Sequence, residues 1–339
     1  MTDTVRVAAV QAEPKWLRLS EGVEQVVGLI GAAAAAGSRL IAFPETFLPG
    51  FPWWRWVESN QWNVEYSTRC RENSMTRDGF EMKVIAEAAR MHGIGVVLGF
   101  GERQDRRIYM AQAVIDDSGQ VLSVRRKAGL NSVERKVFAS GTPNLPAVHH
   151  GSIGKLGALS GQENQRPLLT RALRADEEQI HIAAWPGSPD GDVAGPESSA
   201  TVSRMYALEV GAYVIAPCAI VSDAGWRGSG LWGGGARRTI SSDLQAVATS
   251  GSTGQARIYG ADGSELLTPL AEGVPGILYA DLDLRASGGS SRDAEPSLRT
   301  RRGPAARRAA RGNTGWQAGA DRWALPLSLG NQPWGMAAG

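Results

Sequence analysis

Glu45, Lys127 and the segment 160–163 each come directly after a stretch with the composition of a β-strand. In α/β sheets, ligand and catalytic sites are built at the ends of strands. A carboxylate and an ammonium group that meet at such an edge can transfer protons and stabilise developing charge. These residues are therefore the first candidates for a functional site.

Other common catalytic patterns are missing from the sequence. Neither Gly-x-Ser-x-Gly nor the phosphate-binding Gly-x-x-x-x-Gly-Lys occurs. The dinucleotide-binding spacing occurs once, at 228–233, but it lies inside a Gly-rich segment with no strand directly before it and no helix after it. Two cysteines, Cys70 and Cys218, and four histidines are too few for a Cys-rich metal site. We expect neither a metal nor an organic cofactor.

The surrounding segments in the first half of the chain predict alternating strands and helices. We expect strands over 5–11, 39–45 and 94–100, and helices over 20–37, with Ser20 as N-cap, and 78–92. The run 94–100 is continuously apolar, which is typical of a strand buried on both faces. Segments 108–115 and 120–127 flank a turn at 116–119 and predict an antiparallel pair.

The second half of the chain resumes the same alternation. We expect strands over 155–159, 179–185, 212–221, 255–260 and 276–284, and helices over 166–178 and 197–211. The turn signal Ala261-Asp262-Gly263 predicts a hairpin between the last two strands. Strands alternating with helices, interspersed with hairpins, indicate an α/β domain with a mixed sheet or two stacked sheets.

Several motifs occur in order along the chain: Phe43-Pro44-Glu45-Thr46-Phe47, Arg125-Arg126-Lys127 with Val133-Glu134-Arg135, Gly157-Ala158-Leu159 with Glu163-Asn164, His181 to Pro186, Ser203 to Glu209, Ala256 to Gly260, and Gly276 to Asp281. Together they resemble the nitrilases of the carbon–nitrogen hydrolase superfamily. The resemblance covers roughly residues 5–284. It implies a single nitrilase-like α-β-β-α sandwich over residues 1–284, followed by an irregular tail, 285–339.

The resemblance also implies a catalytic Glu, Lys and Cys set, in which a thiolate attacks the nitrile carbon. Glu45 corresponds to the base that deprotonates the thiol, and Lys127 to the cation that stabilises negative charge on nitrogen and later on oxygen. Glu134, seven residues after Lys127, corresponds to a second carboxylate that orients Lys127 or a water. Water then hydrolyses the covalent thioimidate and acyl intermediates.

A glycine stands at the position of the nucleophile. In the family's pattern a Cys follows Gly-Ala-Leu-x, and here that position is Gly161, followed by Gln162 where the family usually has Trp. Ser160 offers a hydroxyl one residue away, but successive strand residues face opposite sides, so we expect it to point away unless the chain bulges. Cys70 and Cys218 lie outside the matching segment, and buried thiols are mostly inert. We therefore expect an impaired active site.

Tryptophans near these motifs are candidates for the substrate pocket. Trp53 and Trp54 belong to the aromatic segment 51–56 after Glu45, which either lines the pocket or makes packing or subunit contacts, and Trp185 ends the strand 179–185. The Trp-rich segment favours an aromatic or arylaliphatic nitrile over cyanide. The expected partner is thus a small-molecule nitrile.

The composition of the chain limits the classes of protein to which it can belong. The chain has 339 residues, 42% of them hydrophobic and 21% charged, which is enough to bury a full-sized core. The longest apolar run, 26–37, is shorter than the roughly 20 residues that cross a bilayer, and the N-terminus shows no secretory signal, so we expect a cytoplasmic protein without a membrane partner.

The net charge of +2 hides an uneven distribution. Residues 285–339 carry nine arginines and three acidic residues, which leaves −4 for residues 1–284. Because no aromatic residues are interleaved with the arginines between Arg285 and Arg311, we do not expect nucleic acid as a partner. We expect this tail and the Gly/Ser-rich segment 225–253 to be largely irregular.

The resulting hypothesis is the hydrolysis of a nitrile, with two waters, to a carboxylate and ammonia. We expect a homo-oligomer whose contacts involve the helices 166–178 and 197–211. Two alternatives stay open. One is an amidase of the same superfamily, and the other is a catalytically inactive homologue that keeps the fold as a binding or assembly module.

Overall fold

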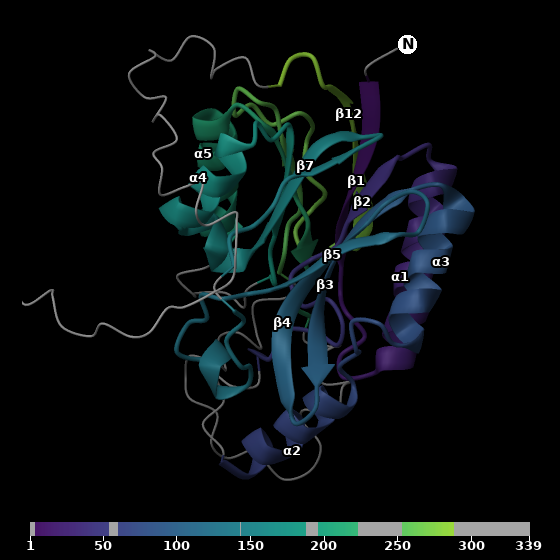
Figure 1. Cartoon of the computed structure of the whole chain (residues 1–339), viewed down its shortest axis with the longest axis vertical. Coiled ribbons are helices and arrows are strands. Elements are labelled where there is room, and N and C mark those ends of the chain that lie inside the picture. Colours follow the sequence, from purple (N-terminus) through teal and green to yellow (C-terminus); the bar gives the residue numbers. More distant parts are fainter. Residues whose placement is uncertain (1–3, 54–59, 143, 188–195, 223–252, 288–339) are drawn as a thin grey trace, which may run out of the picture. The chain divides into compact units, whose positions relative to one another are not determined.

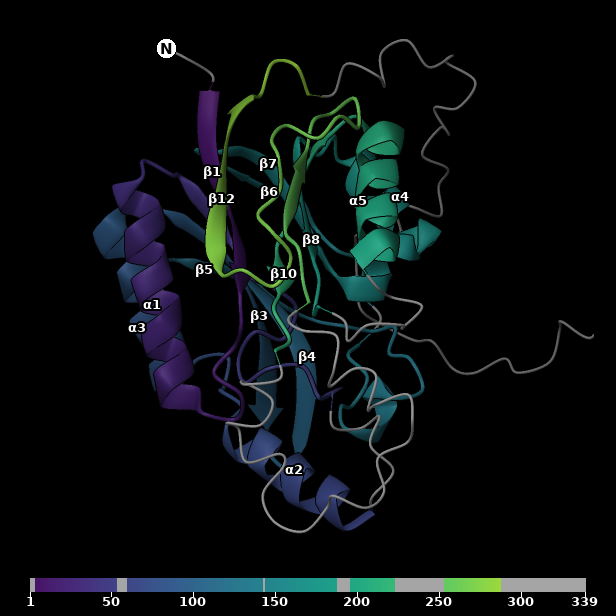
Figure 2. The same cartoon turned by 180° about the vertical axis from the view of Figure 1, so that it is seen from behind.

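The computed structural model describes residues 4–53, 60–142, 144–187, 196–222 and 253–287. These residues all belong to one compact unit, Met1–Asp293, which Figures 1 and 2 show from opposite sides. The predictions for Trp54, for most of the segment 225–253 and for the tail beyond residue 287 lie outside the described residues.

Two sheets organise this unit. Among the described residues the first sheet has seven strands, in the order β10-β1-β2-β3-β4-β5, with β12 also paired to β1. Their bounds are β1 (Thr4–Ala12), β2 (Leu40–Ala42), β3 (Gly95–Gln104), β4 (Arg107–Ile115), β5 (Val121–Arg126), β10 (Cys218–Ala219) and β12 (Gly276–Asp283). Strands β1, β2 and β3 run parallel, whereas β3, β4 and β5 are antiparallel neighbours. The mixed sheet and the predicted antiparallel pair are confirmed.

The second sheet has the order β11-β9-β8-β7-β6. Its strands are β6 (His149–Gly151), β7 (Gly154–Ser160), β8 (Ile180–Ala184), β9 (Tyr213–Ala216) and β11 (Arg257–Tyr259). The predicted hairpin between β11 and β12 is wrong, because β11 pairs with β9 while β12 pairs with β1 in the first sheet. The turn does form, but it only brings Glu265 back to Tyr259, and a local turn signal cannot tell which strand a later segment will join.

Helices cover the outer face of each sheet, as Figure 1 shows. They are α1 (Leu19–Ala35) and α3 (Phe80–His92) on the first sheet, and α4 (Pro167–Ala175) and α5 (Pro196–Val210) on the second. This arrangement confirms the α-β-β-α sandwich. Among the described helices, none has the length and the apolar character that crossing a membrane requires.

Alternating side chains of the strands build two cores. In β1, Val7 and Ala9 face the second sheet, while Ala8 and Val10 pack with residues of α1 and α3. In β3 the first eight residues are all buried, which confirms a strand covered on both faces. A strand segment covered on both faces by other elements is thus apolar, as residues 95–101 of β3 are.

Two local features differ from the sequence-based expectation. Ser20 does not cap α1, because the helix begins at Leu19, whose backbone N–H donates to Asn73 Oδ1 over 3.1 Å. Asn73 follows α2 (Asn60–Glu72), a helix that the sequence did not predict because it lacks a regular apolar stripe. Buried Tyr66 and Cys70 attach α2 to the rest of the unit instead. In both cases a contact distant in sequence supplies what the local pattern lacks.

Candidate active site

Glu45 lies in a turn just beyond β2 that passes closely over β3. Its backbone N–H donates to the carbonyl of Trp185 over 3.3 Å, which ties the turn to the end of β8 in the other sheet. The next residue, Thr46, has φ 48°, a strained value for a β-branched residue. A Cβ atom at Gly99, below the turn, would lie 2.7 Å from Thr46 N and 2.9 Å from Glu45 Cα. Gly99 is therefore required for the position of Glu45.

Replacing Gly99 by alanine is expected to displace this turn, because the clash is with backbone atoms that cannot rotate away. We expect a loss of about 1–3 kcal/mol in the free energy of unfolding, measured by urea denaturation. Gly95→Ala is the matched control on the same strand, since a Cβ there would meet no atom closer than 3.5 Å. Equal losses for the two variants would contradict the close passage of the Glu45 turn.

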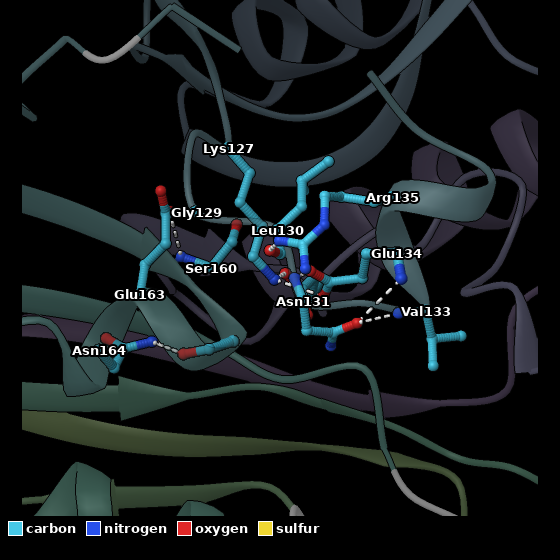
Figure 3. Close-up of polar contacts among 12 residues, drawn as sticks. Lys127, Gly129, Leu130, Asn131, Val133, Glu134, Arg135, Ser160, Glu163 and Asn164 are labelled. Atoms are coloured by element: carbon cyan, nitrogen blue, oxygen red, sulfur yellow. Dashed lines mark hydrogen bonds and ion pairs between the residues drawn. The ribbon is translucent and has the colours of Figure 1, made fainter. Parts of the chain in front are cut away.

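Lys127 brings two carboxylates together. Its Nζ lies 2.7 Å from Glu45 Oε1 and 2.7 Å from Glu134 Oε1, and all three side chains are at most 2% exposed. Glu134 opens the short 3-10 helix η2 (Glu134–Lys136), and its Oε2 accepts a hydrogen bond from the backbone of Asn131. Asn131 Oδ1 in turn accepts from the backbone N–H groups of Val133 and Glu134 (Figure 3). The structure therefore joins three residues that the sequence analysis had placed in one site.

Burial and mutual interaction set the charges of this cluster. Burial raises the pKa of Glu45 to about 7, because the attraction of Lys127 only partly offsets desolvation and Glu134 adds repulsion. Burial alone would lower the pKa of Lys127, but the two carboxylates outweigh it and raise that pKa. At neutral pH the lysine stays an ammonium group, and Glu45 is able both to give and to take a proton.

Gly161 lies against the carboxyl group of Glu45. It follows β7 as the first residue of the 3-10 helix η3 (Gly161–Gln165) and has φ 48°, in the left-handed region that favours glycine. A Cβ atom at this position would lie 3.0 Å from Glu45 Cδ and closer still to Oε2. A side chain at position 161 would thus emerge directly beside Glu45.

The neighbouring residues Ser160 and Glu163 hold each other at this turn. The Ser160 hydroxyl accepts a hydrogen bond from the backbone N–H of Glu163. The Glu163 carboxylate accepts one from the backbone N–H of Ser160 over 3.3 Å (Figure 3). This reciprocal pair is a capping box. The hydroxyl of Ser160 is therefore engaged in the start of η3.

Glu163 also connects the turn to the strand that carries Lys127. It is fully buried and forms an ion pair with Arg125, with 2.9 Å between Nη1 and Oε1. Burial would raise the pKa of Glu163, but Arg125 outweighs it and lowers that pKa. The same carboxylate accepts a 3.4 Å hydrogen bond from the backbone of Ala128. Glu163 thus links the end of β5 to the turn at residue 161. Its place in a motif did not predict this role.

A buried polar chain holds the turn from the other side. Asn164 Nδ2 donates to the Gly161 carbonyl over 2.8 Å, and Asn164 Oδ1 lies 2.8 Å from His181 Nε2. His181 Nδ1 lies 2.8 Å from Glu178, which also accepts from the Tyr206 hydroxyl over 2.6 Å. The imidazole stacks on the Tyr206 ring at 3.7 Å between centroids. Four buried side chains from η3, β8, α5 and the loop before β8 therefore orient one peptide group of the site.

Comparison with known proteins identifies the family. Residues 6–289 match the carbon-nitrogen hydrolase family. The chain is also 40% identical over 287 residues to a nitrilase of Pseudomonas syringae pv. syringae (strain B728a), which covers 84% of this chain and 82% of that protein. This chain belongs to the carbon–nitrogen hydrolase family. An aliphatic nitrilase of Rhodococcus rhodochrous is 37% identical over 300 residues, covering 87% of this chain and 79% of that protein. The resemblance inferred from the motifs is confirmed.

Solved structures of this family share the fold. An amidase of the nitrilase superfamily from Nesterenkonia AN1 superposes with a TM-score of 0.61 at 18% identity, covering 85% of this chain and 95% of that one. A carbon–nitrogen hydrolase from Helicobacter pylori G27 gives 0.61 at 19% identity, covering 88% and 96%. At these identities the match supports the sandwich architecture of this carbon–nitrogen hydrolase and nothing finer.

The predicted pocket tryptophans occupy buried positions. The Trp185 indole donates to Ser203 Oγ over 3.0 Å and packs in the core between the sheets, while its carbonyl holds Glu45. Trp53 is 3% exposed and packs on Phe51 at 4.6 Å between ring centroids. Trp54 lies outside the described residues. A role in substrate binding stays a prediction for all three.

Neither thiol of this carbon–nitrogen hydrolase is set up as a nucleophile. Burial raises the pKa of Cys70 to about 12 and that of Cys218 to about 11, so both stay protonated at neutral pH. Over the described segments, no group of three or more His, Cys, Asp or Glu side chains could hold a metal ion.

Proposed function

We propose that this chain is a nitrilase-type hydrolase whose site binds an organic nitrile. The observation that carries the proposal is the buried contact of Lys127 Nζ with both Glu45 and Glu134, next to the backbone of residue 161. The relatives at 37–40% identity are nitrilases, which favours a nitrile over an amide. The Trp-rich segment after Glu45 supports an aromatic or arylaliphatic substrate.

In this proposal Glu45 acts as the base and Lys127 stabilises the negative charge that develops on the nitrile nitrogen. Glu134 orients Lys127 through the second 2.7 Å contact. Gly161 has no side chain, so the covalent bond that would begin the reaction cannot form there. A water molecule deprotonated by Glu45 is then the remaining nucleophile, and turnover of the natural chain is very slow.

Gly161 also favours a second candidate, a catalytically inactive homologue that retains the fold as a binding or assembly module. The test is ammonia release from benzonitrile, phenylacetonitrile, an aliphatic nitrile and benzamide, combined with calorimetric binding of the same compounds. Slow ammonia release from the nitriles alone supports the nitrilase. Faster release from benzamide supports an amidase, and binding without any release supports the inactive homologue.

We further propose that the chain forms a homo-oligomer through α4 and α5. These helices leave large apolar side chains exposed, among them Leu168 at 77%, Met205 at 57% and Leu208 at 46%. Such residues are typical of subunit contacts that bury roughly a few thousand square ångströms. Light scattering at micromolar concentration is expected to give at least a dimer, and a monomer would contradict the proposal. A cytoplasmic location and the lack of a nucleic-acid partner stay predictions.

A further inference from the structure

A cavity of about 400 Å³ lies where β4 and β5 of the first sheet approach β6 and β7 of the second. Its size is within the range of small-molecule pockets. None of Glu45, Lys127 and Glu134 lines this cavity. Arg125 does, and it reaches the residue 161 turn only through its ion pair with Glu163. The cavity is therefore separate from the candidate active site.

The wall of the cavity is basic. Arg77, Arg125 and Arg126 line it, and no Asp or Glu among the described residues does. Their partner carboxylates, Glu102 and Glu163, are at most 2% exposed, whereas the three arginine side chains keep exposures between 15% and 46%. A guanidinium group has five donors, of which a single carboxylate engages only some. This wall therefore offers positive charge to an anion.

Gln112 contributes a buried donor to the same wall. Its residue is 2% exposed, and its Nε2 has no hydrogen-bond partner within the described part of the chain. Gln112 on β4 pairs with Arg125 on β5, and directly opposed residues of an antiparallel pair point to the same face. A buried amide donor without a partner is unfavourable, so an acceptor in the cavity would stabilise it.

The rest of the lining mixes apolar and polar residues. Val114, Val124 and Ala158 contribute to the wall, and Leu145 is 65% exposed at the same cavity. His149 also lines it, 2.8 Å from the Ser123 hydroxyl, and burial lowers the pKa of His149, so the positive charge comes from the arginines. The cavity thus combines an apolar surface with donors and cations, which suits a ligand with an apolar body and one anionic group.

We propose that this cavity binds a small organic carboxylic acid, with the Gln112 amide donating to the carboxylate, the arginines supplying the positive potential and the apolar wall contacting the body of the acid. A carboxylic acid is also the product of the reaction proposed above. The inference does not depend on that reaction, because binding requires no turnover.

The test is calorimetric titration of the full chain with phenylacetate, phenylacetamide and inorganic phosphate. Phenylacetate is expected to bind at least about tenfold more tightly than the other two, since only it combines charge and an apolar body. Equal binding of phosphate would overturn the apolar part of the proposal, and equal binding of phenylacetamide would overturn the anionic part. No binding of phenylacetate at millimolar concentration would show that the cavity holds only water.

The variant Gln112→Leu tests whether the acid binds in this cavity. Because the substitution removes an unpaired donor, we expect the stability of the fold to be unchanged or higher, while phenylacetate binds at least about tenfold more weakly. Gln112→Glu, which places a carboxylate against the ligand, is expected to weaken binding as well. Gln25→Leu on α1, another glutamine with a buried unpaired amide atom, is the control and should leave binding unchanged. Undiminished binding in both Gln112 variants would place the acid elsewhere, for instance beside Lys127, and would overturn the proposal.

Discussion

Gly161→Cys is expected to raise ammonia release from nitriles by several orders of magnitude. Glu45, Lys127 and Glu134 already form a buried cluster, and a side chain at position 161 would emerge beside the Glu45 carboxyl group. With a pKa of about 7, Glu45 is suited to deprotonate the new thiol. Deleting the nucleophile of a serine protease costs about a million-fold in turnover, which indicates how much a restored nucleophile has to contribute.

The same substitution is expected to lower stability. At φ 48° a side chain costs roughly 1–2 kcal/mol, and the new Cβ would crowd Glu45. The atoms that it meets belong to the end of a flexible side chain, so the site should adjust. Gly161→Ala is the matched control, because it adds the same Cβ and the same backbone strain without a thiol. We expect equal melting temperatures for the two variants and an increase in ammonia release over the natural chain for the cysteine variant alone.

Two further measurements test the roles of the neighbours in the Gly161→Cys protein. Ammonia release should rise as the pH increases through about 7, because the base, Glu45, must be deprotonated. Ser160→Ala should change turnover little, since that hydroxyl caps η3. A folded Gly161→Cys protein that releases no ammonia from any nitrile would show that the site has lost more than its nucleophile. If the natural chain is active and Ser160→Ala abolishes that activity, Ser160 would be the nucleophile.

Removing Lys127 is expected to cost more stability than removing Glu45. Lys127→Met leaves two buried carboxylates without their cation, which costs roughly 3–5 kcal/mol. Glu45→Gln leaves Lys127 paired with Glu134 over 2.7 Å, so we expect a smaller loss. Because Lys127 has two carboxylate partners, we do not expect the two single substitutions to cost the same.

Urea denaturation of the two single variants and the double variant measures this coupling. The double variant should lose less free energy of unfolding than the sum of the two single losses, because the side chains share one contact. Strictly additive losses would show that they do not interact.

Stability should also depend on the protonation of Glu45. Because the pKa of Glu45 in the folded chain lies above its ordinary value, the proton is held more tightly in the folded state, and this contribution to stability is lost as the pH rises through about 7. Glu45→Gln should therefore flatten the fall in stability between pH 5 and 8.

The order of motifs along the chain determined the family, and apolar periodicity determined most strands and helices. These features are local, since a buried strand such as β3 or a turn such as 116–119 is specified by the side chains within it. The candidate set Glu45, Lys127 and Glu134, with glycine at position 161, could likewise be predicted because each residue stands inside a recognisable motif. The absence of the nucleophile is a property of the sequence alone.

Contacts between distant segments were decided only by the tertiary structure. The sheet that β12 joins and the Asn73 cap of α1 depend on packing partners that no local pattern specifies. Lys127 and Glu45 are 82 residues apart, and their shared burial sets the pKa of Glu45. The unpaired Gln112 amide beside a cavity is visible only once both sheets are in place. The local sequence specifies the periodicity of apolar residues and the residues that form turns. The burial of a side chain and the pairing of a strand depend on how separate elements pack together in three dimensions.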